Sequence, residues 1–245
     1  GVDTIFGYPG GAIMPIYDAL YSYMDRVKHI LTRHEQGAIH AAQGYSRVSG
    51  KVGVCFATSG PGATNLITGI ADAQIDSTPL VCVTGQVPSY LLGTDAFQES
   101  DVIGISMPVT KWNYQITSSK EIPEIISKAF YIAKSGRPGP VLIDITKDAQ
   151  FSDLNFKYKK CEKIRSYHPY PILDDNKVSD AAKLIDKSKR PMILVGQGVL
   201  LSNAEKELIE FSEKSGIPLA STLLGLSAVS CNHKNYVGYL GMHGN

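Results

Sequence analysis

The stretch that decides the fold begins at Val52 and reads Val-Gly-Val-Cys-Phe-Ala-Thr-Ser-Gly-Pro-Gly-Ala-Thr-Asn, ending at Asn65. Residues 52–57 form an apolar run of strand length, and residues 58–65 form a turn rich in glycine and polar residues. An all-apolar strand that leads into a helical pattern is typical of a parallel sheet covered by helices on both faces. We therefore predict an α/β fold with residues 58–65 at the carboxyl end of a strand, where open parallel sheets bind ligands.

The alternation of apolar strands and helical patterns extends along the first part of the chain. Apolar runs over residues 79–84 and 141–145 predict further buried strands, and helical periodicity over 64–76 and 122–134 predicts helices. We therefore predict that residues 1–150 form one domain, a parallel sheet flanked by helices.

A lysine-rich segment separates this domain from a second one. Residues 151–172 contain prolines, many lysines and little periodicity, so we interpret them as a solvated linker rather than a binding patch. The alternation then restarts, with strands expected over 191–195 and 217–220 between helical patterns. Residues 173–245 are thus predicted to be the start of a second, truncated Rossmann-like α/β domain.

Composition limits the classes of function. The 245 residues are 43% hydrophobic and 19% charged, with a formal net charge of +1, which gives no reason to expect nucleic acid or a membrane as partner. No apolar run reaches the ~18 residues of a spanning helix. Cys55 and Cys82 lie in apolar runs and predict buried free thiols. The chain starts without Met and stops in a glycine-rich turn, so we expect a fragment, and its excess of lysine over arginine slightly favours a plastid over a bacterial cytoplasm.

One acidic residue stands out near the beginning of the chain. Glu35 lies in Arg33-His-Glu-Gln-Gly-Ala38, between an apolar segment and a helical stretch of small residues. A carboxylate at this place is either a solvated acid favoured by the helix dipole or a buried group with a chemical role. Position alone favours the first of these readings.

Further polar loops follow the predicted strands, but none matches a common catalytic motif. Residues 58–65 lack the lysine of a phosphate-binding loop and do not match Gly-x-Gly-x-x-Gly, so a nucleotide-phosphate site is disfavoured. Ser59 lacks the Gly-x-Ser-x-Gly context of a hydrolase nucleophile. The six histidines show no metal-ligand spacing, so we predict no metal ligand within this chain.

Six motifs carry a resemblance to a known family. In order they are Tyr8-Pro-Gly-Gly11, Arg33-His-Glu-Gln-Gly-Ala38, Ala57-Thr-Ser-Gly-Pro-Gly-Ala-Thr-Asn65, Thr84-Gly-Gln-Val-Pro88, Gly93-Thr-Asp-Ala-Phe-Gln-Glu99 and Ser135-Gly-Arg-Pro-Gly-Pro-Val141. In this order the chain resembles the catalytic (large) subunit of acetolactate synthases, which are thiamine diphosphate (ThDP) enzymes. The resemblance implies that residues 1–150 are the pyrimidine-binding domain of the ThDP-binding fold and that the second domain is of the central, FAD-binding type.

The resemblance also implies roles for particular residues. Glu35 would be the catalytic carboxylate that hydrogen-bonds the pyrimidine ring of ThDP and promotes its activation. Gly11, Ala12, Phe97, Gln98 and Lys147 would line the substrate site. The other residues implied to lie on the ThDP side are Tyr8, Pro9, Gly10, Gly11, Ser59, Gly60 and Asn65.

The implied FAD contacts lie mostly in the second domain. They are Arg137, Gly196, Gln197, Gly198, Thr222, Leu223, Leu240, Gly241, Met242, His243 and Gly244. The magnesium ion of the family is implied to have its ligands outside this chain. A homodimer is implied, because in the family the pyrimidine-domain glutamate meets ThDP held by a partner subunit, and a small regulatory subunit is a further implied partner.

The function implied by the resemblance is that of a transferase in branched-chain amino acid biosynthesis. It would decarboxylate pyruvate and condense it with a second 2-oxo acid, giving 2-acetolactate or 2-aceto-2-hydroxybutanoate. One alternative is another ThDP and FAD enzyme, such as a pyruvate oxidase or a related carboligase. The other is a nucleotide-binding or interaction module without catalysis, and we expect the isolated fragment to be inactive.

Overall fold

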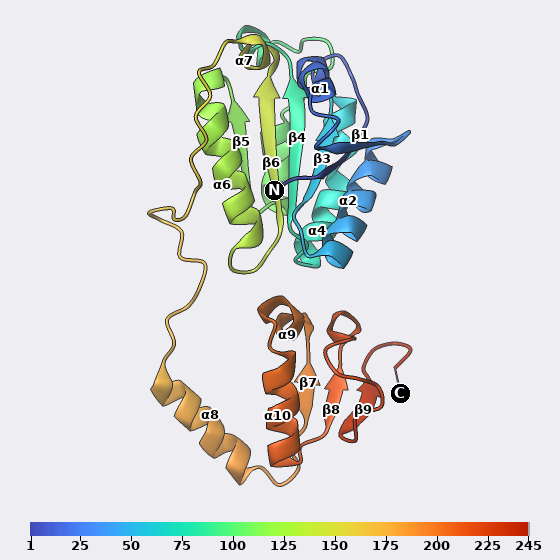
Figure 1. Ribbon diagram of the computed structural model, residues 1–245, viewed down its shortest axis with the longest axis vertical. Helices are drawn as coiled ribbons and strands as arrows, with labels where there is room; N and C mark the ends of the chain where they lie inside the picture. Colours follow the sequence, from blue (N-terminus) through green and yellow to red (C-terminus); the bar gives the residue numbers. More distant parts are fainter. Residues whose placement is uncertain (245) are drawn as a thin grey trace. The chain divides into compact units, whose positions relative to one another are not determined.

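The computed structural model describes residues 1–244; Asn245, the last residue of the predicted second domain, lies outside them. The chain forms two compact units, residues 1–171 and residues 172–245, both shown in Figure 1. Within residues 1–244, no helix combines the length and the apolar character that crossing a bilayer requires.

The first unit is built on a six-stranded sheet with the order β2-β1-β3-β4-β6-β5. All neighbouring strands are parallel, which confirms the predicted fold class. The central strands β3, β4 and β6 are buried along their whole length, as their apolar sequences require. The strands are β1 (Thr4–Gly7), β2 (Lys28–Leu31), β3 (Gly53–Ala57), β4 (Leu80–Gln86), β5 (Trp112–Ile116) and β6 (Pro140–Thr146).

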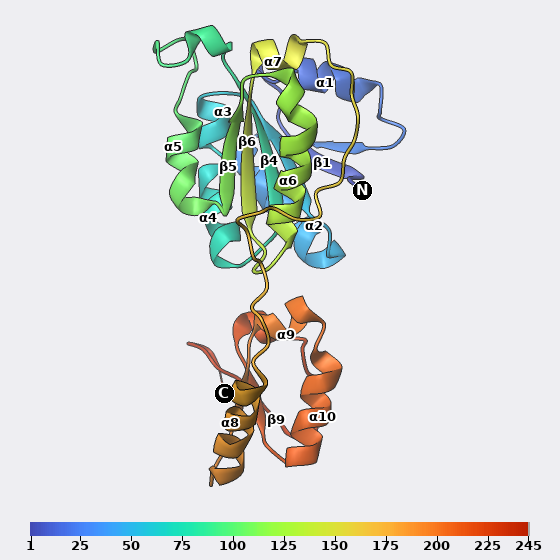
Figure 2. The same cartoon turned by 90° about the vertical axis from the view of Figure 1, so that its left-hand side faces the viewer.

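Helices cover both faces of this sheet, so alternate strand residues enter two separate cores. Val54 and Phe56 pack in one core with residues of α1 and α6, whereas Cys55 and Ala57 pack in the other with residues of α2 and α4. Figure 2 shows α3, α4 and α5 on one side of the sheet and α6 and α7 on the other. The helices are α1 (Met14–Tyr21), α2 (Glu35–Ser49), α3 (Pro61–Thr64), α4 (Ile67–Ile75), α5 (Val102–Ser106), α6 (Ile122–Lys134) and α7 (Lys147–Phe151).

The small residues of α2 explain how this helix reaches the sheet. Ala38 and Ala42 are fully buried, and a Cβ added to Gly53 of β3 would lie 2.4 Å from the Ala42 carbonyl oxygen. The helix begins after His34, whose Nδ1 accepts a hydrogen bond from Gln36 N at 3.1 Å, and it ends at Gly50 in the left-handed conformation. Helix and strand therefore pack backbone against backbone, and the start of α2 is fixed at Glu35.

Some elements differ from the sequence prediction. The helix predicted over 64–76 forms as α4, which begins only at Ile67. The residues before it form the separate short helix α3 and a tight turn in which Leu66 N bonds Ala63 O. Strand β5 was not predicted, because its polar residues Asn113 and Gln115 break the apolar pattern of a central strand and β5 lies at the edge of the sheet.

The segment predicted as a linker packs against the first unit as far as residue 171. Cys161 N donates to Ser127 Oγ of α6 at 2.7 Å, and the Tyr167 ring meets that of Tyr131 edge-on at 6.1 Å between centroids. Lys111 Nζ donates to the Tyr167 hydroxyl at 3.1 Å. The sequence shows no periodicity here because only isolated residues such as Ile164 reach the core.

The second unit has a three-stranded parallel sheet with the order β7-β8-β9. Its small core contains Val195, Leu219, Ala228 and Val229. Strand β9 and helix α9 were not predicted from the sequence. The elements are α8 (Asp175–Lys187), β7 (Ile193–Val195), α9 (Gln197–Ser202), α10 (Glu205–Ser215), β8 (Leu219–Ser221), the 3-10 turn η4 (Leu223–Gly225) and β9 (Tyr236–Tyr239).

Candidate functional site

The loops that follow β1, β3, β4 and β6 meet at the carboxyl edge of the first sheet (Figure 1). Ala12 lies at their centre: its N–H donates to Thr58 Oγ1 at 3.1 Å, and its carbonyl accepts from Gln150 Nε2 at 2.9 Å. A Cβ added to Gly10 would lie 2.5 Å from the Thr58 side chain, and one added to Gly85 would lie 2.3 Å from the Ala12 carbonyl oxygen. These loops are therefore locked together at distances that only glycine permits.

Glu35 stands at this edge as the first residue of α2 and is 7% exposed. Its Oε2 accepts a hydrogen bond from Asn65 Nδ2 at 2.9 Å. Its Oε1 faces Gly62, where an added Cβ would lie 3.2 Å away. The burial rules out a solvated helix-start acid, and the glycine leaves room for another group to approach the carboxylate.

Burial favours the uncharged forms of the ionisable groups around Glu35. Burial raises the pKa of the Cys55 thiol well above its ordinary value, and Cys82 and Glu35 raise it further. Burial also raises the pKa of the Tyr17 hydroxyl, with Cys55 and Glu35 adding to the effect. The Tyr17 hydroxyl lies 3.2 Å from His29 Nε2, and burial lowers the pKa of that histidine. Both cysteines are free and buried, as the sequence predicts.

The loop after β4 brings Phe97 and Gln98 to the same edge. A Cβ added to Gly60, which has a φ of +54°, would lie 2.6 Å from the Gln98 carbonyl oxygen, so this loop lies directly on the loop after β3. Gln98 itself has a φ of +60°, a strained value for a residue with a side chain. The Phe97 side chain is 88% exposed, and Gln98 is also exposed. Both side chains are therefore free to contact a ligand.

The other predicted residues of the first unit fall into two places. Tyr8, Pro9, Gly11 and Ser59 belong to the loops after β1 and β3, and Lys147 begins α7 directly after β6. All of these lie at the carboxyl edge. Arg137 lies instead in the turn before β6, at the amino edge, where its guanidinium donates to Ser77 Oγ at 2.7 Å and to Ile75 O at 2.9 Å.

The residues predicted to contact FAD in the second unit lie at the carboxyl edge of its own sheet. Gly196 follows β7, Thr222 follows β8 and Leu240 follows β9. Thr222 Oγ1 accepts from Gly225 N at 3.1 Å, and a Cβ added to Gly225 would lie 2.2 Å from the Val195 carbonyl oxygen. The residues grouped at this edge are Gly196, Gln197, Gly198, Thr222, Leu223, Leu240, Gly241, Met242, His243 and Gly244.

Sequence reasoning missed a buried polar network beneath the first site. Asp144 of β6 has no exposed surface; it accepts hydrogen bonds from Thr84 Oγ1 at 2.5 Å, Gln115 Nε2 at 2.9 Å and Gln86 Nε2 at 3.0 Å. One signal could have found it: Asp144 interrupts an otherwise apolar strand sequence, Val141-Leu-Ile-Asp-Ile145. A carboxylate buried in this way needs hydrogen-bond donors around it.

Asp144 gives the fold a distinct pH dependence. Burial raises the pKa of Asp144 from an ordinary 3.8 to about 6, and the charge of Asp101 adds to the rise. The hydrogen bonds from Thr84, Gln115 and Gln86 lower the pKa and offset part of this effect. The folded chain therefore holds this proton more tightly than the unfolded chain. Its contribution to stability is full below about pH 4 and is lost as the pH rises through about 6.

We expect this loss to be on the order of 2–3 kcal/mol between pH 4 and pH 7. Urea unfolding of the wild type and Asp144→Asn at pH steps in this window measures it. The variant should lack this component. An equal pH dependence in the two proteins would contradict the assignment of the proton to Asp144.

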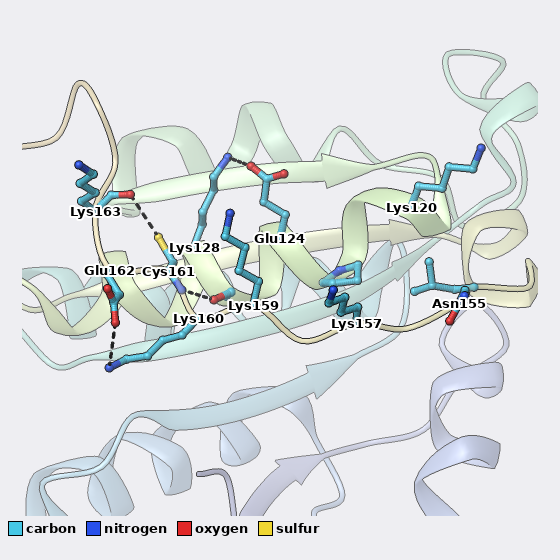
Figure 3. Close-up of a pocket in the computed structure, with 13 residues that line it drawn as sticks. Lys120, Glu124, Lys128, Asn155, Lys157, Lys159, Lys160, Cys161, Glu162 and Lys163 are labelled. Carbon is cyan, nitrogen blue, oxygen red and sulfur yellow. Dashed lines mark hydrogen bonds and ion pairs between the residues drawn. The ribbon is translucent and has the colours of Figure 1, made fainter.

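A hollow of about 640 Å³ lies away from these loops, between α6 and residues 154–163 (Figure 3). Lys128 pairs with Glu124 at 2.5 Å, and Lys160 lies 3.9 Å from Glu162. In Figure 3 the lysine side chains point in different directions rather than toward one centre. We assign no ligand to this hollow. Its lysines are Lys120, Lys128, Lys157, Lys159, Lys160 and Lys163.

Comparison with known families agrees with the two units. Residues 1–105 match the family described as thiamine pyrophosphate enzyme, N-terminal TPP binding domain, and residues 178–245 match its central domain. The chain belongs to the thiamine pyrophosphate enzyme family. The buried Glu35 thus lies within the part that matches the cofactor-binding domain of this family.

Individual relatives in the family are similar along almost the whole chain. The chain is 51% identical to the acetolactate synthase large subunit of Corynebacterium glutamicum over 242 residues, which is 99% of this chain and 38% of the relative. It is 52% identical to a probable acetolactate synthase large subunit of Methanococcus aeolicus, over 99% of this chain and 41% of the relative. It is 51% identical to the acetolactate synthase isozyme 2 large subunit of Escherichia coli K12, over 100% of this chain and 43% of the relative. The chain therefore spans about two fifths of the length of these curated relatives.

Proposed function

We propose that the chain is part of an acetolactate synthase large subunit, a ThDP-dependent transferase that joins two 2-oxo acids. The observation that carries the proposal is the buried carboxylate of Glu35, which Asn65 holds at 2.9 Å at the edge where the loops of a parallel sheet meet. The chain shares about 51% of its aligned residues with proteins named acetolactate synthase large subunits, which supports the choice of reaction. The products would serve branched-chain amino acid biosynthesis.

The residues at this edge fit the pyrimidine ring of ThDP. Gly62 leaves Oε1 of Glu35 open to a ring nitrogen, because a Cβ at this position would lie only 3.2 Å from that oxygen. Bound ThDP supplies an acidic carbon that becomes the nucleophile toward a 2-oxo acid. Glu35 Oε1 would hold the proton exchanged with the ring, and the low dielectric of a buried site strengthens that hydrogen bond. The loop residues Tyr8, Pro9, Gly10, Gly11, Ser59 and Gly60 would line the same side of the ThDP site.

The substrate would lie against the loops after β1, β4 and β6. The exposed Gln98 offers an amide N–H to a carbonyl oxygen, and the Lys147 ammonium suits the carboxylate of a 2-oxo acid. Phe97, which is 88% exposed, would cover the apolar part of the substrate. Gly11 and Ala12 would allow close approach of the backbone.

We propose FAD as a second cofactor, held by the glycine-rich carboxyl edge of the second sheet. Gly196 to Gly198 begin a helix directly after β7, an arrangement that suits close approach of a phosphate or ribose group. Arg137 is a further proposed FAD-binding residue, because its guanidinium suits phosphate oxygens. Its bonds to Ser77 and Ile75 leave further N–H groups for that role.

We further propose that Mg²⁺ accompanies ThDP and is bound by residues other than those described here. Among residues 1–244, no group of three or more His, Cys, Asp or Glu could hold a metal ion. The active form would be at least a homodimer, in which a partner subunit supplies the diphosphate half of the ThDP site. The relatives are named large subunits, which supports a small regulatory subunit as a further partner. The compartment, plastid or cytoplasm, stays a prediction from composition.

Incubation of the full-length protein with pyruvate, ThDP, Mg²⁺ and FAD tests the reaction. We expect 2-acetolactate and carbon dioxide to form without oxygen uptake. Hydrogen peroxide with oxygen uptake would show a pyruvate oxidase instead and would overturn the proposal. No turnover of pyruvate under these conditions, with both cofactors bound, would favour a module without catalysis.

A further inference from the structure

The loop over residues 87–100 carries Phe97 and Gln98, and one side chain holds both of its ends. Gln86, the last residue of β4, accepts a hydrogen bond from Val87 N through Oε1 at 2.9 Å. Its Nε2 donates to the Ser100 carbonyl oxygen at 3.0 Å. Gln86 is fully buried, so these hydrogen bonds are shielded from competing water.

Asp144 sets the orientation of that amide. The second N–H of Gln86 Nε2 donates to Asp144 Oδ2 at 3.0 Å, so both amide hydrogens are used. A carboxylate accepts hydrogen bonds but donates none, so it admits only the NH₂ end of the Gln86 amide at this position. The buried network therefore fixes which end of Gln86 faces the loop.

The rest of the loop is braced internally. The Glu99 carboxylate accepts from Gly93 N and from Ala96 N, and the Gly93 hydrogen bond holds the pKa of Glu99 below its ordinary value. Near the start of the loop, Ser89 N donates to Asp148 at 2.8 Å. The loop is thus held together by its own hydrogen bonds, and its bonds to Gln86 and Asp148 decide where its tip lies.

We propose that Gln86, oriented by Asp144, is a positioning residue that sets where Phe97 and Gln98 stand relative to Glu35. The inference rests on the proposed function in treating Phe97 and Gln98 as substrate contacts. Gln86 itself lies beneath the loop and touches no reacting group. Its effect on catalysis passes through the placement of the loop, and a displacement of about 1 Å at a reacting group can cost up to about 100-fold in rate.

Gln86→Met tests the proposal, because methionine keeps the length of the side chain and removes all its hydrogen bonds. Thr84→Val is the matched control: it removes a buried hydrogen bond to the same Asp144 carboxylate, from the same strand, but Thr84 has no bond to the loop. Hydrogen exchange of peptides from residues 88–100 in the full-length protein is the first readout. Steady-state kinetics with pyruvate is the second.

We expect amide exchange in this loop to rise by at least about tenfold in Gln86→Met and to stay at the wild-type level in Thr84→Val. We also expect Gln86→Met to raise the KM for pyruvate by about tenfold or more, with the concentration of ThDP needed for half-saturation unchanged, because the Glu35–Asn65 pair is untouched. Gln86→Leu gives a second route if Gln86→Met does not fold. Leucine also removes both hydrogen bonds to the loop, so it should loosen the loop in the same way.

Wild-type exchange rates in both Gln86→Met and Gln86→Leu would overturn the inference, and so would equal loosening by Thr84→Val. A different result is that the exchange rates rise as expected in Gln86→Met while the wild type forms no acetolactate. That result would support the anchoring role of Gln86 and overturn the proposed function. The two failures are thus distinguishable.

Discussion

Glu35→Gln should lower turnover of pyruvate by the full-length protein by roughly two to three orders of magnitude, the range for loss of a group that moves a proton. Glutamine keeps the size of the side chain and can still accept from Asn65 Nδ2, which now donates to Oε2 at 2.9 Å. It cannot take up a proton at Oε1. The fold should therefore survive while activation of the cofactor fails. Initial rates of acetolactate formation at saturating ThDP measure the effect.

Glu124→Gln is the matched control. Glu124 also lies in the first turn of a helix of the first unit, but its side chain is 71% exposed and its partner is Lys128 on the same helix. An exposed pair of this kind contributes little to stability, so activity and melting temperature should stay close to the wild type. A loss of less than about threefold in Glu35→Gln, or a similar loss in both variants, would contradict the catalytic role of Glu35.

Gly85→Ala should destabilise the protein by roughly 1–3 kcal/mol and also reduce its activity. The added Cβ would lie 2.3 Å from the Ala12 carbonyl oxygen and 2.7 Å from Ile13 N, so it meets backbone that cannot turn aside. Either β4 or the loop after β1 must move, and that loop lies against Thr58 at the proposed cofactor site. Urea unfolding and the pyruvate assay on the same preparation measure the two effects.

Gly44→Ala is the control for this substitution. Gly44 is an exposed position within α2, and a Cβ there would meet nothing within 4 Å. Alanine in the middle of a helix should stabilise the protein by about 0.5–1 kcal/mol, because glycine is the poorer helix former. A Gly85→Ala protein as stable and as active as Gly44→Ala would show that the loops at the carboxyl edge adjust freely.

The pattern of apolar residues predicted the elements whose burial is regular along the chain. Residues 122–134 were predicted as a helix and form α6 with the same bounds, and the apolar runs near residues 52–57, 79–84 and 141–145 form β3, β4 and β6. Each of these patterns is local, because a buried strand is apolar throughout and a surface helix is apolar on one side. Edge elements such as β5 follow neither rule and were missed.

The sequence predicted individual residues of the candidate site but not how they lie relative to one another. The sequence placed Glu35 at a helix start, and the structure adds its burial and its bond to Asn65. The structure also places Arg137 in the turn before β6, at the opposite edge of the first sheet from Glu35. The roles of these residues stay predictions until the variants are assayed.

The sequence by itself determined that this chain is a parallel α/β protein and which loops are rich in glycine and polar groups. Only the tertiary structure decided that β4 lies between β3 and β6, which places Gln86 beside Asp144 although 58 residues separate them in the chain. Strand order is a property of the whole chain, since it depends on how distant strands pair and how their connections pack. Composition and periodicity reflect the surroundings of a single helix or strand, so they cannot reveal a hydrogen bond between residues of two strands that are distant in the sequence.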